Sequence, residues 1–175
     1  MTLIPPDAPL RHRDSYRIRT WDIDARGALT GIAYTRLLLD VAGQHARMLG
    51  LGIHDMFRHG HTWVLSRFSA RLDRVPRLRE EITVDTFPGG LERLYALREF
   101  RVSDGDGEPV GHGSSAWLVL RLDKRRPARP QPFFEGFDLS RLPEQGTLPD
   151  RVPAPPDGVE PLNTLTFRVR NSDID

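Results

Sequence analysis

The sequence predicts an α+β domain in which a curled antiparallel sheet wraps around one long helix. Two observations lead to this fold class: one long stretch with helical hydrophobic periodicity, and five stretches in which apolar and polar residues alternate. One alternating stretch precedes the helix and four follow it, joined by tight turns. Burying one helix against one antiparallel sheet is the simplest way to hide the apolar faces of such a chain. At 175 residues, the chain is long enough to bury a sizeable core without cross-links.

The predicted helix begins after Thr30 and ends near Gly50. Threonine is a favourable N-cap, and glycine is favoured just beyond the last turn of a helix. Apolar side chains recur at spacings of three and four residues, which predicts one buried face. That face carries Tyr34, Leu38, Val41, His45 and Met48, and Leu37 and Leu49 widen it.

Five strands are predicted from the alternation of apolar and polar residues. In chain order they cover residues 16–21, 63–72, 81–87, 94–102 and 110–123. The third strand is expected to end at Pro88-Gly89-Gly90, and Asp104-Gly-Asp-Gly107 is a typical hairpin turn. In the second strand, Val64 and Phe68 are expected to share one face.

A long helix wrapped by a curled antiparallel sheet is the hotdog fold. Hotdog domains normally pair, because a single one leaves a sheet edge open. We therefore expect either a homodimer formed by hotdog pairing or a second hotdog domain within one chain.

Proline content divides the chain into three parts. Residues 1–123 are expected to form an N-terminal hotdog domain, residues 124–163 a proline-rich inter-domain linker, and residues 164–175 the first strand of a second, truncated hotdog. Nine of the fifteen prolines lie in the linker, where they exclude helix interiors and central strands.

An internal repeat accounts for the last part. The segment Tyr16-Arg-Ile-Arg-Thr-Trp-Asp-Ile-Asp24 matches Phe167-Arg-Val-Arg-Asn-Ser-Asp-Ile-Asp175, with identical residues at five of the nine positions. The two copies are too far apart for a solenoid repeat. The repeat therefore indicates a duplicated domain whose second copy begins near residue 164.

Composition excludes several classes of protein. The absence of cysteine rules out disulfide frameworks, thiol nucleophiles and cysteine-based metal sites. Basic and acidic residues, 25 and 24 in number, are nearly balanced, which does not fit a nucleic-acid-binding surface. The longest apolar run, residues 116–120, cannot span a bilayer, and residues 1–6 lack a signal-peptide pattern. We expect a cytoplasmic protein with neither nucleic acid nor a membrane as its partner.

A set of short motifs resembles the acyl-acyl-carrier-protein (acyl-ACP) thioesterases. In order, they are Trp63-Val-Leu-Ser-Arg67, Arg74-Val-Pro-Arg77, Thr86-Phe-Pro-Gly-Gly-Leu-Glu-Arg93, Ser115-Ala-Trp-Leu118 and Arg125-Arg-Pro127. The resemblance covers nearly all of residues 14–175. It implies a double hotdog that hydrolyses long-chain acyl thioesters at the end of fatty-acid synthesis, with acyl-carrying ACP as its partner. It also implies that the N-terminal half supplies most of the acyl pocket and the C-terminal half the catalytic groups.

The family's catalytic turn reads D-x-N-x-H-V-N-N, and its aspartate corresponds to Asp175, after which this sequence has no further residues. In the first copy of the repeat, Asp24 takes the same position. Arg26, Ala28 and Thr30 stand where the family has asparagine, histidine and asparagine. Alanine can neither polarise a thioester carbonyl nor activate water. We therefore expect this chain by itself not to hydrolyse acyl thioesters at an enzyme-like rate. No cofactor is expected.

The acyl chain is expected to lie between the helix and the sheet. The expected substrate-binding residues are Leu38, Val41, Ala42 and His45 on the helix, and Val64, Phe68 and Ala116 on the sheet. The same side chains would also make an ordinary core, because cores and acyl tunnels use the same residue types. In a pocket, depth should set the preferred chain length, since each buried methylene contributes about 0.8 kcal/mol.

Two other functions stay open. The chain could be a non-catalytic acyl-binding or assembly module built on a degenerate hotdog. It could also be a single-hotdog acyl-CoA thioesterase or polyketide cyclase that acts as a homodimer. The repeated opening strand at residues 167–175 favours the two-domain thioesterase over the homodimeric enzyme.

Overall fold

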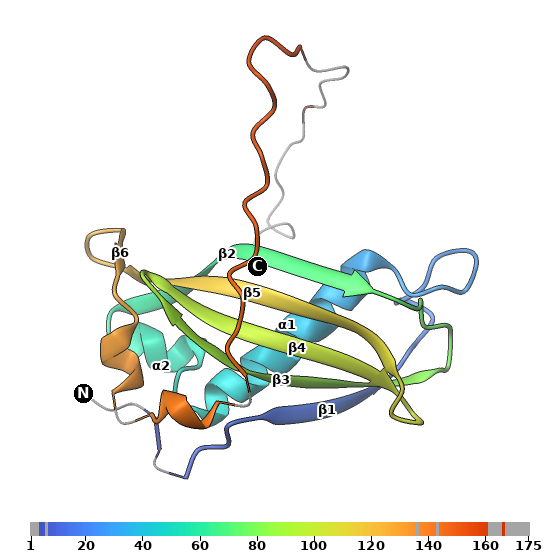
Figure 1. Ribbon diagram of the computed structural model, residues 1–175, viewed down its shortest axis with the longest axis horizontal. Helices are drawn as coiled ribbons and strands as arrows, with labels where there is room; N and C mark the ends of the chain where they lie inside the picture. The colour runs from blue at the N-terminus through green and yellow to red at the C-terminus, as the bar shows by residue number, and fades with distance from the viewer. Residues whose placement is uncertain (1–3, 6, 136, 143, 161–165, 167–175) are drawn as a thin grey trace.

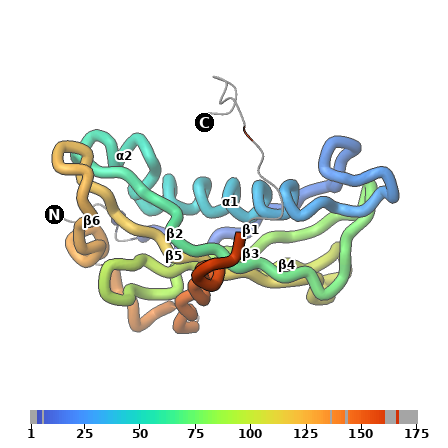
Figure 2. The backbone as a smooth tube through the Cα atoms, turned by 90° about the horizontal axis from the view of Figure 1, so that it is seen from above, coloured from blue at the N-terminus to red at the C-terminus, as the bar shows by residue number. Residues whose placement is uncertain are grey.

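One long helix, α1 (Gly31–Met48), lies along one face of an antiparallel sheet (Figures 1 and 2). The computed structural model describes residues 4–5, 7–135, 137–142, 144–160 and 166 of the chain. Within these residues, a second helix, α2 (Ile53–Arg58), follows α1 closely and packs beside β2. Sequence patterns had not predicted α2, because six residues are too few to show helical periodicity.

The sheet has the strand order β1-β3-β4-β5-β2, and all its paired strands are antiparallel. Its strands are β1 (His12–Arg17), β2 (His61–Leu72), β3 (Glu81–Glu92), β4 (Tyr95–Asp104), β5 (Pro109–Arg121) and the short β6 (Arg126–Ala128), which pairs with the end of β5. Strands β1 to β5 and α1 follow the predicted order of one strand, one helix and four strands, whereas β6 lies within the expected linker and was not predicted. Strands β1 and β2 form the two edges of the sheet.

Both ends of α1 are as predicted. The Thr30 hydroxyl accepts a hydrogen bond from the backbone N–H of Ala33 at 3.2 Å, and Gly50 has a φ of +67°, which suits glycine. The predicted buried face is confirmed except for Met48, which is 46% exposed. Leu49, predicted to widen the face, is buried.

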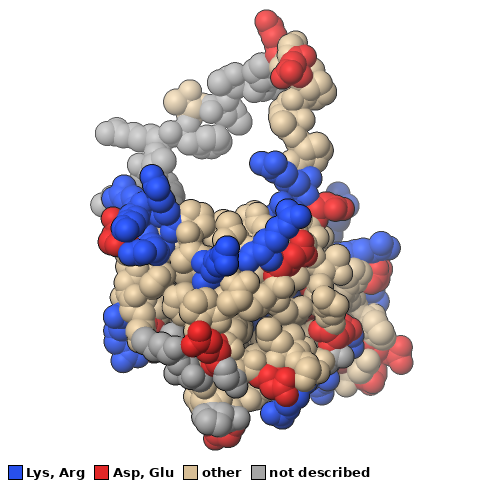
Figure 3. All heavy atoms as spheres, turned by 60° about the vertical axis from the view of Figure 1, so that its left-hand side comes forward, with Lys and Arg blue, Asp and Glu red and all other residues tan. Residues whose placement is uncertain are grey.

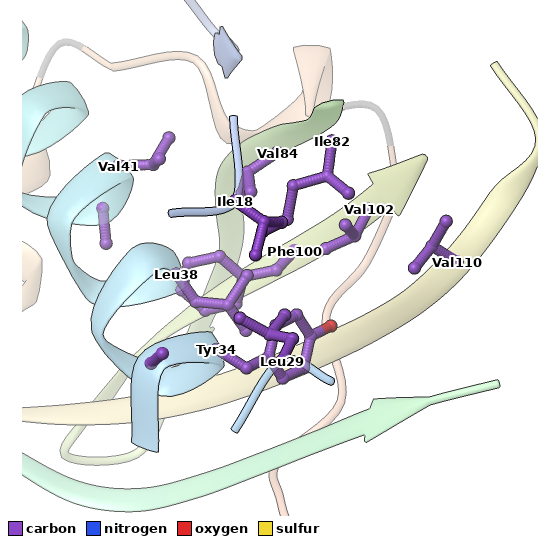
Figure 4. Close-up of a cluster of buried hydrophobic side chains, with 12 residues drawn as sticks. Ile18, Leu29, Tyr34, Leu38, Val41, Ile82, Val84, Phe100, Val102 and Val110 are labelled. Atoms are coloured by element: carbon purple, nitrogen blue, oxygen red, sulfur yellow. The ribbon is translucent and has the colours of Figure 1, made fainter. Parts of the chain in front are cut away.

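Two clusters of buried side chains hold the helix to the sheet. The first, shown in Figure 4, is made of Ile18, Leu29, Ala33, Tyr34, Leu38, Val41, Ala42, Ile82, Val84, Phe100, Val102 and Val110. The second lies around α2 and contains Ile4, Leu49, Leu51, Met56, Ala96, Val119, Phe133 and Phe134. The two phenylalanines belong to the expected linker and form part of a short 3₁₀ helix (Gln131–Phe134). This part of the linker therefore packs against the domain.

Strand β1 begins and ends earlier than predicted. Its pairing with β3 stops at Arg17, and the chain then turns, with the Asp22 carboxylate accepting a hydrogen bond from the backbone N–H of Arg19 at 2.9 Å. An aspartate that bonds to backbone N–H groups nearby favours a turn over a continued strand. Trp21, predicted as the last residue of the strand, is 73% exposed.

Strand β3, by contrast, continues through Pro88 to Glu92. A β-bulge lies between Pro88 and Gly90, and Gly90 has a φ of +107°. Pairing with β1 reaches only as far as Thr86 on β3, so among the described residues no strand pairs with the proline on that side. The expected strand end at residues 88–90 is therefore a bulge within the strand.

A second bulge changes which side chains of β2 face the helix. The register with β5 moves from the pair Leu65–Trp117 to the pair Arg67–Ala116, so Ser66 is an extra residue. One extra residue turns the following side chains to the opposite face. Phe68 packs against the first cluster, as predicted. Val64, on the other side of the bulge, is 40% exposed and lies on the face opposite to α1, contrary to the prediction.

After β6 the chain crosses the outer face of the sheet, on the side away from α1 (Figure 2). The Gly146 N–H donates to the Gly89 carbonyl at 2.7 Å, and the Arg67 guanidinium donates to the Pro149 carbonyl at 3.0 Å. Residues 144–149 therefore extend from β3 to β2. Residues 151–160 are exposed and extend away from the domain (Figure 1). Apart from Thr166, the expected first strand of a second hotdog lies outside the described residues.

Charged side chains of both signs are interspersed on the face drawn in Figure 3, in keeping with the nearly balanced composition. Neither helix in the described part of the chain is long and apolar enough to cross a membrane.

Candidate functional site

A cavity of about 620 Å³ lies between the C-terminal half of α1, α2 and the neighbouring strands. Its apolar lining includes Leu39, Ala42, Leu49, Leu51, Trp63, Trp117 and Phe134. Polar side chains are few: Arg47, His54, Asp55 and Arg98. A concave, mainly apolar space with a few polar groups is typical of a small-molecule site.

Small residues of α1 leave this space open. Ala42, Gly43 and Ala46 line it, and a Cβ atom placed on Gly43 would meet no other atom within 4 Å. Positions 42 and 46 are one helical turn apart and therefore share a face. Because these side chains are small, room is left beside this part of the helix, and that room forms part of the cavity.

Two tryptophans form rigid parts of the wall. The indole N–H of Trp63 donates to the Leu51 carbonyl at 2.9 Å, and that of Trp117 donates to the Ser115 hydroxyl at 2.9 Å. A buried indole needs such a partner, and the hydrogen bond also fixes the orientation of the ring. The cavity is therefore bounded by flat apolar surfaces with no unpaired indole N–H.

The mouth of the cavity lies beside α2. Ile53 and His54 of α2 and Arg47 of α1 line the cavity and are also exposed to solvent. The two helices approach closely here, since a Cβ atom on Gly52 would lie 2.8 Å from the Arg47 side chain. Arg58 forms an ion pair with Asp55 at the same rim.

Arg98 is the polar group of the sheet wall. Its Nη1 donates to His45 Nδ1 at 3.0 Å and to the Thr86 hydroxyl at 3.2 Å. Burial lowers the pKa of Arg98 to about 10, so the guanidinium stays cationic at neutral pH. It is a positive charge in the wall of a mainly apolar cavity.

His45 of α1 holds the Arg98 guanidinium in position through a hydrogen bond. Its Nε2 donates to the Pro9 carbonyl at 2.8 Å, which leaves Nδ1 to accept from Arg98. Burial, together with the adjacent Arg98 cation, lowers the pKa of His45 to about 4. The imidazole is therefore neutral at neutral pH and acts as a hydrogen-bond acceptor for the arginine.

The predicted substrate-binding residues do not form one group. Ala42 lines the cavity, and His45 lies one contact away from it through Arg98. Leu38 and Val41 have no exposed surface and belong to the first core cluster.

The three predicted sheet residues are placed differently. Phe68 packs against the first core cluster, and Val64 lies on the outer face of the sheet. Ala116 is buried, but its neighbour Ser115 pairs with Arg98 on the side of α1, so Ala116 points toward the outer face. Asp175 lies outside the described residues.

Arg98 was not among the residues predicted from the sequence, although it is the only charged residue that β4 contributes to the cavity among the described residues. The alternation of β4 contained the signal, because Ala96 and Phe100, two residues on either side, are both buried. An arginine between two buried residues of the same face is unusual enough to indicate a site.

The turn around Asp24 lies before the N-terminus of α1, whereas the cavity lies along its C-terminal half. The Asp24 carboxylate accepts from the backbone N–H groups of Arg26 at 2.9 Å and Ala28 at 3.1 Å, and these bonds lower its pKa. The carboxylate therefore stabilises its own turn, in which Gly27 has a φ of +73°.

Comparison with known proteins agrees with the motifs in the sequence. Residues 9–133, more than half of the chain, match the family model of the acyl-ACP thioesterase N-terminal domain. The crystal structure of an acyl-ACP thioesterase from Bacteroides thetaiotaomicron is similar with a TM-score of 0.76 and 30% identity, covering 94% of this chain and 66% of that one. This likeness confirms the predicted hotdog fold.

Curated relatives are more distant in sequence. A chloroplastic oleoyl-acyl carrier protein thioesterase from Coriandrum sativum is 23% identical over 124 residues, which are 67% of this chain and 34% of the relative. A chloroplastic palmitoyl-acyl carrier protein thioesterase from Arabidopsis thaliana is 24% identical over 140 residues, 76% of this chain and 31% of the relative. The chain thus spans about a third of the length of these relatives. The family match over residues 9–133 shows that the chain belongs to the acyl-ACP thioesterase family, with its N-terminal domain in that region.

Proposed function

We propose that this chain is the acyl-binding part of an acyl-ACP thioesterase and that the cavity beside α1 holds the acyl chain of the substrate. The observation that carries the proposal is a mainly apolar cavity of about 620 Å³ whose helix and strand walls lie within the region matched to the family's N-terminal domain. The substrate class is a long-chain acyl thioester carried by ACP, as the names of the relatives suggest.

Acyl binding by this cavity has a direct physical basis. Each methylene transferred from water to an apolar wall contributes about 0.8 kcal/mol, so binding should strengthen with chain length until the cavity is full. The acyl chain would enter beside α2 and lie against Ala42, Ala46 and the two tryptophans. The thioester and the carrier protein would stay at the mouth.

Hydrolysis is proposed to depend on groups outside the described residues. Asp175 remains the family's aspartate position as proposed from the sequence, and Asp24 is engaged in its own turn. We propose that the partner is acyl-carrying ACP, that the location is cytoplasmic, and that the open edge of the sheet pairs with a second hotdog.

The binding test uses the purified chain and ACP carrying an acyl chain through an amide in place of the thioester. We expect affinity to rise with chain length and then level off, measured by tryptophan fluorescence or calorimetry. Ala46→Phe, which places a large ring in the cavity, should weaken the longest chains most. Ile32→Phe, an exposed position on the same helix, is the matched control and should leave the length profile unchanged. Equal affinity for acylated and unacylated ACP would overturn the proposal.

A thiol-release assay separates this proposal from the alternatives. We expect the chain alone to release thiol from acyl-ACP or acyl-CoA no faster than buffer does. Turnover that is lost in Asp24→Asn would instead indicate a single-hotdog thioesterase. Acyl binding without hydrolysis, even when the second half of a family relative is added, would indicate a non-catalytic binding module.

A further inference from the structure

Arg98 is a cation in the cavity wall that lacks an acidic partner among the described residues. Its hydrogen bonds run from Nη1 to two neutral acceptors, His45 and Thr86. Each acceptor stabilises the position of the guanidinium, but neither carries a charge that could balance it. Arg98 is half-buried, and a positive charge that is partly removed from water without a counter-charge is unfavourable.

The rest of the guanidinium is available to a ligand. Within the described residues, Nε and Nη2 of Arg98 have no hydrogen-bond partner, yet they are not among the enclosed polar atoms that lack one. Arg98 lines the cavity and is half-buried, so these two groups are able to face the cavity. Nε and Nη2 lie on one edge of the guanidinium and can donate two parallel hydrogen bonds to a single carboxylate.

A hydrocarbon chain alone cannot accept hydrogen bonds from the Arg98 guanidinium in the cavity wall. Alkyl groups placed over Nε and Nη2 would remove them from water without replacing their hydrogen bonds, which is unfavourable. A carboxylate at the same place would accept both hydrogen bonds and balance the charge. The apolar surfaces of Trp63, Trp117 and Leu49 would still be available to an aliphatic tail.

We propose that the cavity also binds free aliphatic monocarboxylates, with the carboxylate held by Nε and Nη2 of Arg98 and the tail directed toward the mouth. The free acid would thus bind in the opposite direction to the acyl thioester, whose carbonyl end stays at the mouth. The proposal rests on the proposed function in one respect, that the same cavity takes the acyl chain. In a thioesterase the ligand would be the released acid, which would compete with the next substrate.

The test compares laurate, methyl laurate and dodecanol, which share a twelve-carbon chain. Laurate is used below its critical micelle concentration, and the two uncharged ligands are used below their solubility limits. Calorimetry at neutral pH should give laurate an affinity at least tenfold higher than the two uncharged ligands. In Arg98→Gln this preference should disappear while the affinity for dodecanol stays within a factor of about two. Arg47→Gln, at the mouth of the cavity, is the matched control and should keep the preference.

Two further measurements address the possible misfolding of Arg98→Gln and the orientation of bound laurate. Arg98→Lys retains a cation and should keep part of the preference if Arg98→Gln does not fold. In the wild-type chain, laurate labelled with ¹³C at the carboxyl carbon should titrate at a lower pH when bound than when free, because an adjacent cation favours the ionised form.

The outcomes distinguish this inference from the proposed function. Equal binding of laurate and dodecanol by the wild-type chain would overturn it, and so would a preference that is lost in Arg47→Gln and kept in Arg98→Gln. The proposed function would stand in both cases if amide-linked acyl-ACP still bound. Failure of acyl-ACP binding with retained laurate preference would overturn the proposed function alone.

Discussion

Protonation of His45 should destabilise the fold, and the structure gives the size of the effect. Burial lowers the pKa of His45 from 6.5 to about 4, because the folded protein encloses the ring next to the Arg98 cation. In the unfolded chain the ordinary pKa applies. Each pKa unit corresponds to about 1.4 kcal/mol, so the folded state should lose about 3 kcal/mol when the pH falls through this range.

The direction follows from which state binds the proton first. Between pH of about 6.5 and about 4, the unfolded chain is protonated at this histidine and the folded protein is not. Acidification therefore favours unfolding. The stability that depends on neutral His45 is fully present above pH of about 6.5 and is lost as the pH falls to about 4.

Glu99 also contributes to the pH dependence of the unfolding free energy in the wild-type protein. Burial raises its pKa from 4.5 to about 7, so the folded state is disfavoured where Glu99 is ionised and recovers as the pH falls. The contributions of His45 and Glu99 therefore oppose each other over the same range. For this reason the comparison is made in a Glu99→Gln background, which removes the second titration.

The assay is urea unfolding at pH 7 and pH 4, followed by circular dichroism, for the Glu99→Gln protein with and without His45→Gln. Glutamine keeps an amide donor for the Pro9 carbonyl and an acceptor for Arg98, and it does not titrate. The difference in unfolding free energy between the two proteins should shift by about 3 kcal/mol from pH 7 to pH 4, to the disadvantage of the histidine. A difference that is the same at both pH values would refute the argument that burial keeps His45 neutral.

Three further predictions concern local structure. Thr30→Ala removes the N-cap of α1 and should lower the unfolding free energy by about 1 kcal/mol, measured by urea denaturation. Gly146→Ala places a Cβ atom 2.8 Å from Gly89 and should detach residues 144–149 from the sheet, which hydrogen exchange of this segment would detect, whereas Gly105→Ala, with nothing within 4 Å, should leave exchange unchanged. Glu99→Gln alone should stabilise the protein at pH 8 and have no such effect at pH 4, and equal thermal midpoints for variant and wild type at pH 8 would contradict the raised pKa.

Local patterns in the sequence were sufficient to predict the long helix, the five main strands and their order along the chain. The helix between Thr30 and Gly50 could be predicted because its capping residues and its apolar spacing all act within a few residues of one another. The hairpin turn at residues 104–107 could be predicted for the same reason, since Asp104 bonds to backbone N–H groups two and four residues later. From these elements and the motifs, the fold class and the family followed.

Which residues line the cavity was decided only by the tertiary structure. Periodicity tells which side of its own strand a residue occupies, but the extra residue at Ser66 reverses that side for the part of β2 beyond it and turns Val64 away from the helix. Periodicity also says nothing about what lies opposite a small residue. Leu38 and Ala42 lie on the same helix face and belong to the same core cluster, yet Ala42 also borders the cavity and Leu38 does not. Whether an apolar face closes into core or borders a cavity depends on the volume of the side chains across from it, and only the folded chain brings those side chains together.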